Sequence, residues 1–164
     1  MHGTETQKPE IRPGRNRFMP IGKMLSDGKE IGSALQKASV IAVVGLSPEP
    51  WRDAHRVARY LQTAGYRILP VRPGAVEILG EKAYERLEDI PISIDIVDIF
   101  RRSDQVLAHA LEALKLSPAP SLFWMQEGVS CDRSATQLTA AGIDVIMDRC
   151  IMVDHGRFVK KNRV

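Results

Sequence analysis

Residues 39–74 read SVIAVVGLSPEPWRDAHRVARYLQTAGYRILPVRPG, and this stretch decides the class of fold. The run at 39–45 is apolar and rich in β-branched residues, which is typical of a strand buried on both faces of a parallel sheet. Residues 53–64 repeat apolar side chains at helical spacing. A second apolar run follows at 67–71 and ends in the turn signal Arg-Pro-Gly. The stretch therefore predicts a complete strand–helix–strand unit.

The same alternation of strand and helix patterns continues downstream. The patterns predict strands at 95–100, 121–125 and 143–147 and helices at 83–89, 103–116 and 130–141. Strands that alternate with helices of this length form βαβ units, whose strands are parallel. We therefore expect an α/β fold: a Rossmann-like, open, doubly wound parallel sheet of about five strands with helices on both faces.

The two ends of the chain differ from this regular centre. The first 20 residues are polar and carry three prolines, and a short helix is expected within 21–37, capped by Ser26 or Asp27. Basic residues dominate the C-terminus. Three segments are therefore predicted: a partly flexible N-terminal arm at 1–37, a ligand-binding domain at 38–155 and a basic C-terminal tail at 156–164.

The composition narrows the class of protein. Hydrophobic residues make up 44% and charged residues 26% of the 164 positions, which is ordinary for one globular domain. No apolar run approaches the ~18 residues of a membrane span, and the N-terminus lacks the apolar core of a signal peptide. The two cysteines show no zinc or disulfide spacing. We therefore expect a cytoplasmic protein outside the membrane. The net charge of +3 comes without a nucleic-acid motif, which argues against nucleic acid as a partner.

Candidate ligand-binding residues follow the predicted strands. Open α/β sheets bind ligands at the carboxyl ends of their strands, near the point where the strand order reverses. The segments at these ends are rich in arginine and glycine, which suits a polyanionic nucleotide. The candidates are Gly45, Leu46, Ser47, Arg52, Pro70, Val71, Arg72, Pro73, Phe100, Arg101, Arg102, Gln126 and Gly128.

Some of these signals also have a plain structural interpretation. The Gly45-Leu46-Ser47 turn lacks the later glycines of the GxGxxG fingerprint, so it could serve as a tight turn without a ligand. The alternative for the arginine pair after the third strand is a surface salt bridge with Asp98 or Asp104.

The end of the second strand bears on the choice of nucleotide. An NAD-binding domain needs an acidic residue here for the ribose hydroxyl, whereas this chain has Arg72. A cation favours a ribose that carries a phosphate, as in NADP or coenzyme A. The alternative is that Arg72 is a solvated turn residue.

No complete catalytic constellation is visible, so a binding protein is expected more than an enzyme. His55 is the histidine nearest to the expected cleft, and His109 is expected at an exposed position in the middle of a helix. Cys150 follows the last strand, where it is either a small hydrophobic residue or a reactive thiol. No acidic or histidine cluster has metal-ligand spacing.

Seven short motifs occur in a recognisable order. They are Val43-Val44-Gly45-Leu46-Ser47, Gly65-Tyr66-Arg67, Pro70-Val71-Arg72-Pro73, Leu79-Gly80-Glu81-Lys82-Ala83-Tyr84, Asp95-Ile96-Val97-Asp98-Ile99-Phe100-Arg101-Arg102, Trp124-Met125-Gln126-Glu127-Gly128 and Asp148-Arg149-Cys150. Over residues 39–155 the chain resembles the stand-alone bacterial CoA-binding domain family. That family is similar to the CoA-binding domain of the succinyl-CoA synthetase α subunit.

The resemblance implies which segments of the chain contact each part of the ligand. The turn at 45–47 and the following helix start would hold phosphates, residues 70–73 would border the adenosine, and Phe100-Arg101 with residues 126–128 would line the rest. Two departures are visible: Arg72 stands where the family usually has Asn, and Ala54 stands where it often has Ser.

The resemblance also implies a function. We expect the chain to bind coenzyme A or an acyl-CoA as its small-molecule partner, without catalysis of its own, and to be a monomer or a homodimer. An NADP-dependent oxidoreductase is one alternative, although no Tyr-x-x-x-Lys pair is present. A nucleotide-free interaction protein is the other.

Overall fold

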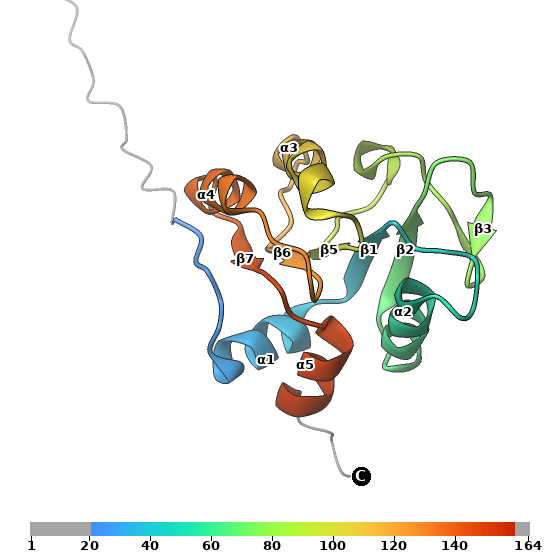
Figure 1. Ribbon diagram of the computed structural model, residues 1–164, viewed down its shortest axis with the longest axis horizontal. Helices are drawn as coiled ribbons and strands as arrows, with labels where there is room; N and C mark the ends of the chain where they lie inside the picture. The colour runs from blue at the N-terminus through green and yellow to red at the C-terminus, as the bar shows by residue number, and fades with distance from the viewer. Residues whose placement is uncertain (1–20, 160–164) are drawn as a thin grey trace, which may run out of the picture.

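The computed structural model describes residues 21–159, which form one five-stranded parallel sheet with helices on both faces (Figure 1). All four pairings between neighbouring strands are parallel, and the order is β2-β1-β5-β6-β7. The predicted Rossmann-like fold is therefore confirmed. The strands are β1 (Val40–Val44), β2 (Arg67–Val71), β5 (Ile96–Ile99), β6 (Leu122–Met125) and β7 (Asp144–Ile146).

The strand order reverses between β1 and β5. From β1 the chain crosses to β2 on one side, and from β5 it continues through β6 to β7 on the other. The crossover helices of the two halves consequently cover opposite faces of the sheet, so the chain leaves β1 and β5 toward opposite faces. Such a switch point opens a crevice at the carboxyl ends of the strands.

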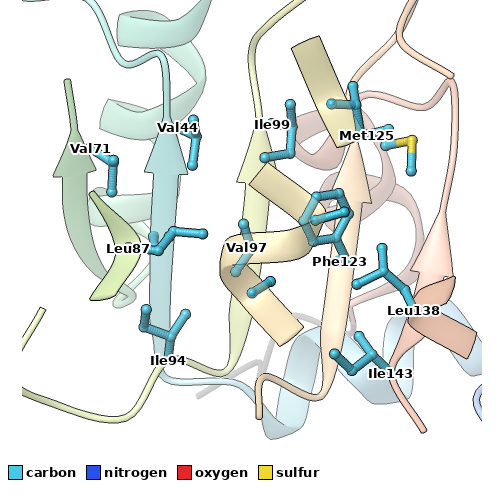
Figure 2. Close-up of a cluster of buried hydrophobic side chains, with 14 of the residues drawn as sticks. Val44, Val71, Leu87, Ile94, Val97, Ile99, Phe123, Met125, Leu138 and Ile143 are labelled. Carbon is cyan, nitrogen blue, oxygen red and sulfur yellow. The ribbon is translucent and has the colours of Figure 1, made fainter. Parts of the chain in front are cut away.

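The helices divide into two layers, as Figure 1 shows. One layer contains α3 (Val106–Leu114) and α4 (Asp132–Ala140), and the other contains α1 (Gly28–Lys37), α2 (Asp53–Thr63) and α5 (Ile151–Phe158). Each strand sends alternate side chains to the two layers, because successive residues of a strand point to opposite faces. Figure 2 shows the α3/α4 side, where Val97, Ile99 and Phe123 pack together. Trp124 and its neighbours fill the other side.

Two helices differ from the expectation for the ends of the chain. Residues 28–37 were assigned to the N-terminal arm, yet Ile31 and Leu35 of α1 are fully buried. Asp27, one of the two predicted caps, accepts a hydrogen bond from the backbone N–H of Glu30. Helix α5 was not predicted, and it crosses the expected boundary between the domain and the tail. The flexibility expected for residues 1–20, and the tail beyond 159, lie outside the described residues.

Smaller differences lie in the connections. The segment after β2 contains a short hairpin, β3 (Glu77–Ile78) and β4 (Glu81–Lys82), and only a 3-10 turn, η1 (Leu87–Asp89), where a helix at 83–89 was expected. A second 3-10 turn, η2 (Ser103–Gln105), precedes α3. The hydroxyl of Ser103 accepts a hydrogen bond from the backbone N–H of Ser130 instead of capping α3. Between residues 21 and 159, no helix is both long enough and apolar enough to cross a bilayer.

Close packing of α1 on α5 yields a stability prediction. A Cβ at Gly32 would lie 2.5 Å from the carbonyl oxygen of Phe158, so the two helices would have to separate. We expect Gly32→Ala to lower the free energy of unfolding by about 2 kcal/mol, despite the better helix propensity of alanine. Gly156→Ala in α5 is the matched control, because its Cβ would find only Tyr60 at 3.7 Å. Urea unfolding should show destabilisation by the first change and neutral or stabilising behaviour of the second; equal effects would contradict the close packing.

Candidate functional site

The largest opening at the switch point is a cavity of about 690 Å³, hereafter the main cavity. It lies at the carboxyl ends of β1, β5 and β6, beside the first turn of α2. The side chains that line it are mostly charged or polar. The lining residues are Gly45, Ser47, Glu49, Arg52, Asp53, Ala54, Arg56, Val57, Arg72, Phe100, Arg101, Arg102, Gln126, Glu127, Val129, Cys150 and Met152.

Gly45 lies where the loops after β1 and β5 approach each other. Its φ of 84° belongs to the left-handed region that favours glycine. A Cβ at this position would overlap the carbonyl oxygen of Phe100 and would lie 3.0 Å from Cδ of Arg101. The glycine is therefore required both for the turn and for the contact between the two loops.

The start of α2 faces the main cavity without a side-chain cap. Arg52 occupies the N-cap position in an extended conformation, and no side-chain hydrogen bond is made there. The nearest hydroxyl, that of Ser47, accepts a hydrogen bond from the backbone N–H of Glu49. Ala54, in the first turn, has no hydroxyl to offer. Asp53 in this turn pairs with Arg56, and the backbone N–H groups at the start of α2 have no side-chain cap among the described residues, so they can bind an anion in the cavity.

The arginines around the main cavity fall into two groups. Three of the five have carboxylate partners within 4 Å, whereas Arg72 and Arg101 pair with no carboxylate of residues 21–159. Unpaired guanidinium groups are available for charge-assisted hydrogen bonds to phosphate. The paired groups are Arg52 with Glu49 at 3.0 Å, Arg56 with Asp53 at 2.9 Å and Arg102 with Asp104 at 3.2 Å.

A second cavity of about 290 Å³ adjoins the main cavity. Three residues line both: Gly45, Arg72 and Arg101. The two unpaired arginines therefore stand between the two spaces, where Gly45 contributes no side chain to divide them. The other residues of the second cavity are Val44, Val71, Pro73, Glu85 and His109.

The structure brings most of the sequence-predicted site residues together. Those that line one or both cavities are Gly45, Ser47, Arg52, Val71, Arg72, Pro73, Phe100, Arg101, Arg102 and Gln126. Three others line neither. Leu46 is fully buried in the core, the carbonyl of Pro70 accepts a hydrogen bond from Tyr84, and the backbone N–H of Gly128 donates to Asp148.

The outcomes for two histidines differ. His55, expected near the cleft, is buried beside it: its Nδ1 lies 3.0 Å from the carbonyl oxygen of Ser47, which lines the main cavity, while His55 itself lines neither cavity. His109 was expected to be exposed, and this is wrong: only 18% of its side chain is exposed, and it forms part of the wall of the second cavity. Its position within the α3 sequence contained no signal for this placement.

The segment at 148–150 holds α5 against the end of β6. The Nε1 of Trp124 donates to the carbonyl of Arg149 at 2.8 Å. The buried Gln126 accepts from the backbone N–H of Ile151 at 3.0 Å, and its Nε2 lies 3.8 Å from the sulfur of Cys150. The motif is therefore structural, and its geometry places Cys150 in the wall of the main cavity.

Asp98 carries a fully buried carboxyl and lies two residues before Phe100, which lines the main cavity. It lies on the same face of β5 as Phe100, between Val43 and Trp124 of the neighbouring strands. Neither of its oxygens has a hydrogen-bond partner among residues 21–159. Burial raises the pKa of Asp98 well above its ordinary value of 3.8, so the group is protonated where other carboxyls are ionised. Of the two aspartates considered as partners for the arginine pair, only Asp104 is used.

The described part of the chain contains no group of three or more histidine, cysteine or acidic side chains placed to hold a metal ion. The two cavities offer an electropositive surface for an anion: a helix start without a side-chain cap, two unpaired guanidinium groups and a glycine turn. Together these features suit phosphate groups.

Comparison with known proteins identifies a matching family and a similar protein. A family model described as CoA binding domain matches residues 39–156. The uncharacterized protein YneT of Bacillus subtilis (strain 168) is 46% identical over 126 residues, which are 77% of this chain and 92% of YneT.

Two solved structures extend the comparison. Cell-free ID.343 from Thermus thermophilus has a TM-score of 0.77 and 40% identity, covering 81% of this chain and 99% of that one. The dinucleotide forming acetyl-coenzyme A synthetase 1 of Ca. Korarchaeum cryptofilum has a TM-score of 0.58 and 25% identity. That match covers 65% of this chain and 25% of the synthetase.

Proposed function

The chain belongs to the CoA binding domain family, and from this premise we propose that it binds coenzyme A or an acyl-CoA in the main and second cavities. The observation that carries the proposal is the pair of unpaired arginines, Arg72 and Arg101, beside the uncapped start of α2. Coenzyme A carries a pyrophosphate and a 3′-phosphate, so its nucleotide end requires several separate anion contacts. The two features supply them.

The strand order suggests how the ligand lies. The pyrophosphate would lie over the Gly45 turn and the start of α2, and the adenosine end would lie toward β2 and Arg72. The pantetheine would then run toward β6 and Cys150. From β2 to β7 there are four interstrand steps, or ~19 Å at ~4.8 Å each, which is room for an extended ligand.

We propose binding without catalysis as the role of this domain. Two side chains of nucleophilic type line the main cavity: the hydroxyl of Ser47 accepts a hydrogen bond from the backbone N–H of Glu49, and the contacts of Cys150 serve the packing of α5. No histidine lines that cavity within residues 21–159. A carrier or sensor of coenzyme A is the function that these side chains support best.

The experiment that tests this proposal is calorimetric titration with coenzyme A, dephospho-coenzyme A and NADP. We expect saturable binding of coenzyme A and weaker binding of the dephospho form. Arg72→Met should weaken coenzyme A binding at least tenfold, because a charge-assisted hydrogen bond contributes about 1.5–3 kcal/mol. Arg102→Met is the matched control: Arg102 is already paired with Asp104, and we expect less than about a threefold change.

Each other outcome has a definite meaning. Tighter binding of NADP than of coenzyme A would favour the oxidoreductase alternative, which rests on the same cation at Arg72. Absence of binding by all three nucleotides would overturn the proposal and leave the nucleotide-free interaction protein.

A further inference from the structure

The second cavity is lined by a cationic group of side chains on the α3 side of the sheet edge. Arg72 and Arg101 contribute two positive charges that no described carboxylate neutralises. Glu85 is the one carboxylate among its lining residues, and it already accepts a hydrogen bond from the backbone N–H of Gly74 at 3.0 Å. The space is therefore suited to a small, doubly charged anion.

His109 completes this group of side chains. Its Nδ1 is buried and has no hydrogen-bond partner among the described residues. The nearest acidic atom is Oε1 of Glu112, at 3.5 Å, while the other oxygen of that carboxylate accepts from the backbone N–H of Leu87. The ring therefore lies in the wall of the cavity, and its buried Nδ1 faces Glu112, which would pair with it if the ring were protonated.

The second cavity has room for a phosphate group. A water molecule needs only about 15 Å³ of comparable space, and the cavity offers about 290 Å³. It also joins the main cavity at Gly45, Arg72 and Arg101, so one ligand can extend into both. A phosphate monoester attached to the nucleotide can thus enter it while the rest of the ligand occupies the main cavity.

We propose that the second cavity receives the 3′-phosphate of the bound nucleotide, and that His109 takes up a proton when the phosphate enters. The inference rests on the proposed function, which it deepens by naming the phosphate subsite and a linkage to pH. Arg72 and Arg101 would donate to the phosphate oxygens, and the protonated ring of His109 would balance the second negative charge.

The electrostatics of the empty cavity favour neutral His109. Burial lowers its pKa below the ordinary value of 6.5, Glu112 raises it and Arg101 lowers it further. Arg72 and Glu85 are the other charged groups in the walls. A phosphate dianion would reverse the local field at the ring, so the charged imidazolium would become the favoured form. Proton uptake on binding follows from this reversal.

The test is calorimetry at about pH 6.5 in buffers of different ionisation enthalpy, which counts the protons taken up per ligand. With coenzyme A, the wild-type protein should take up more protons than His109→Gln, by at most one. With dephospho-coenzyme A the two proteins should agree. His155→Gln is the control, because burial also lowers the pKa of His155 but its ring contacts Tyr60, away from both cavities. Its proton count should equal that of the wild type.

The outcomes separate the two proposals. Equal proton counts for wild type and His109→Gln with coenzyme A would overturn the linkage while leaving coenzyme A binding intact. A difference that persists with dephospho-coenzyme A would also overturn it, because the 3′-phosphate would not be its cause. No coenzyme A binding by the wild type would remove the proposed function itself. If His109→Gln does not fold, NMR titration of the His109 ring in the wild type decides: its pKa should rise with coenzyme A and not with the dephospho form.

Discussion

Gly45→Ala is expected to destabilise the protein by about 3 kcal/mol and to weaken coenzyme A binding at least tenfold. Alanine at a φ of 84° costs about 1 kcal/mol. The overlap of its Cβ with the carbonyl oxygen of Phe100 forces the loops after β1 and β5 apart, which we expect to cost about 2 kcal/mol more. Binding suffers because these loops carry the start of α2 and Arg101.

The control for this substitution is Gly80→Ala. Gly80 has a similar φ of 76°, but a Cβ there would meet nothing within 4 Å. We expect Gly80→Ala to lower the free energy of unfolding by only about 1 kcal/mol, which is the cost of placing alanine at a positive φ. The corresponding loss of Tm is about 3 °C, compared with about 10 °C for Gly45→Ala. Coenzyme A affinity should be unchanged. Equal losses of Tm for the two variants would contradict the close approach at Gly45, and unaltered affinity of Gly45→Ala would contradict the placing of the ligand.

Asp98→Asn is expected to stabilise the protein above about pH 5, by an amount that grows with pH. The wild-type carboxyl is fully buried and unpartnered, and burial raises its pKa well above 3.8. The folded state therefore keeps a proton that the unfolded state releases. Between the unfolded pKa and the folded pKa, each pH unit removes about 1.4 kcal/mol of stability. Below the unfolded pKa both states are protonated, and this loss vanishes.

The measurement is the free energy of unfolding from urea titrations between about pH 4 and pH 8. Asparagine is a neutral isostere, so the variant should match the wild type near pH 4 and exceed it at higher pH. Asp104→Asn is the control, because this carboxylate is exposed and paired only with Arg102; we expect less than about 1 kcal/mol and no added slope. If the free energies of unfolding of wild type and Asp98→Asn change with pH in parallel, the Asp98 carboxyl is not a desolvated group that keeps its proton in the folded state.

Much of the site could be predicted because the fold class determines where loops meet. Parallel strands have their carboxyl ends at one edge, so residues after different strands converge there. Gly45, Arg72, Phe100, Arg101 and Gln126 were expected together on this ground, and they line the cavities. Leu46 and Gly128 stand in the same loops, but Leu46 faces the core and the backbone of Gly128 bonds to Asp148, while Pro70 lies within β2. A strand pattern does not distinguish these orientations once the strand has ended.

Two features of the candidate site could not be predicted from any pattern in the sequence. Which arginines are free depends on the carboxylates that each side chain reaches, and the four candidate arginines looked alike in sequence. The burial of His109 depends on how α3 lies over the end of the sheet. Both are consequences of packing between segments that are distant in the sequence.

The sequence by itself determined the strand–helix alternation, the parallel sheet and the edge of the sheet that carries the candidate site. These follow from local periodicity, since a buried strand and an amphipathic helix each leave a pattern within a dozen residues. Only the tertiary structure decided that α1 and α5 belong to the domain. Helix α5 has eight residues, includes Gly156 and has Cys150 as an N-cap residue without a side-chain cap, so its local signals are weak. Partners distant in the sequence hold this helix in place. The side chain of Gln126 accepts a hydrogen bond from the backbone N–H of Ile151, and the hydroxyl of Tyr60 contacts Nδ1 of His155. Gly28 and Gly32 of α1 pack against Phe158.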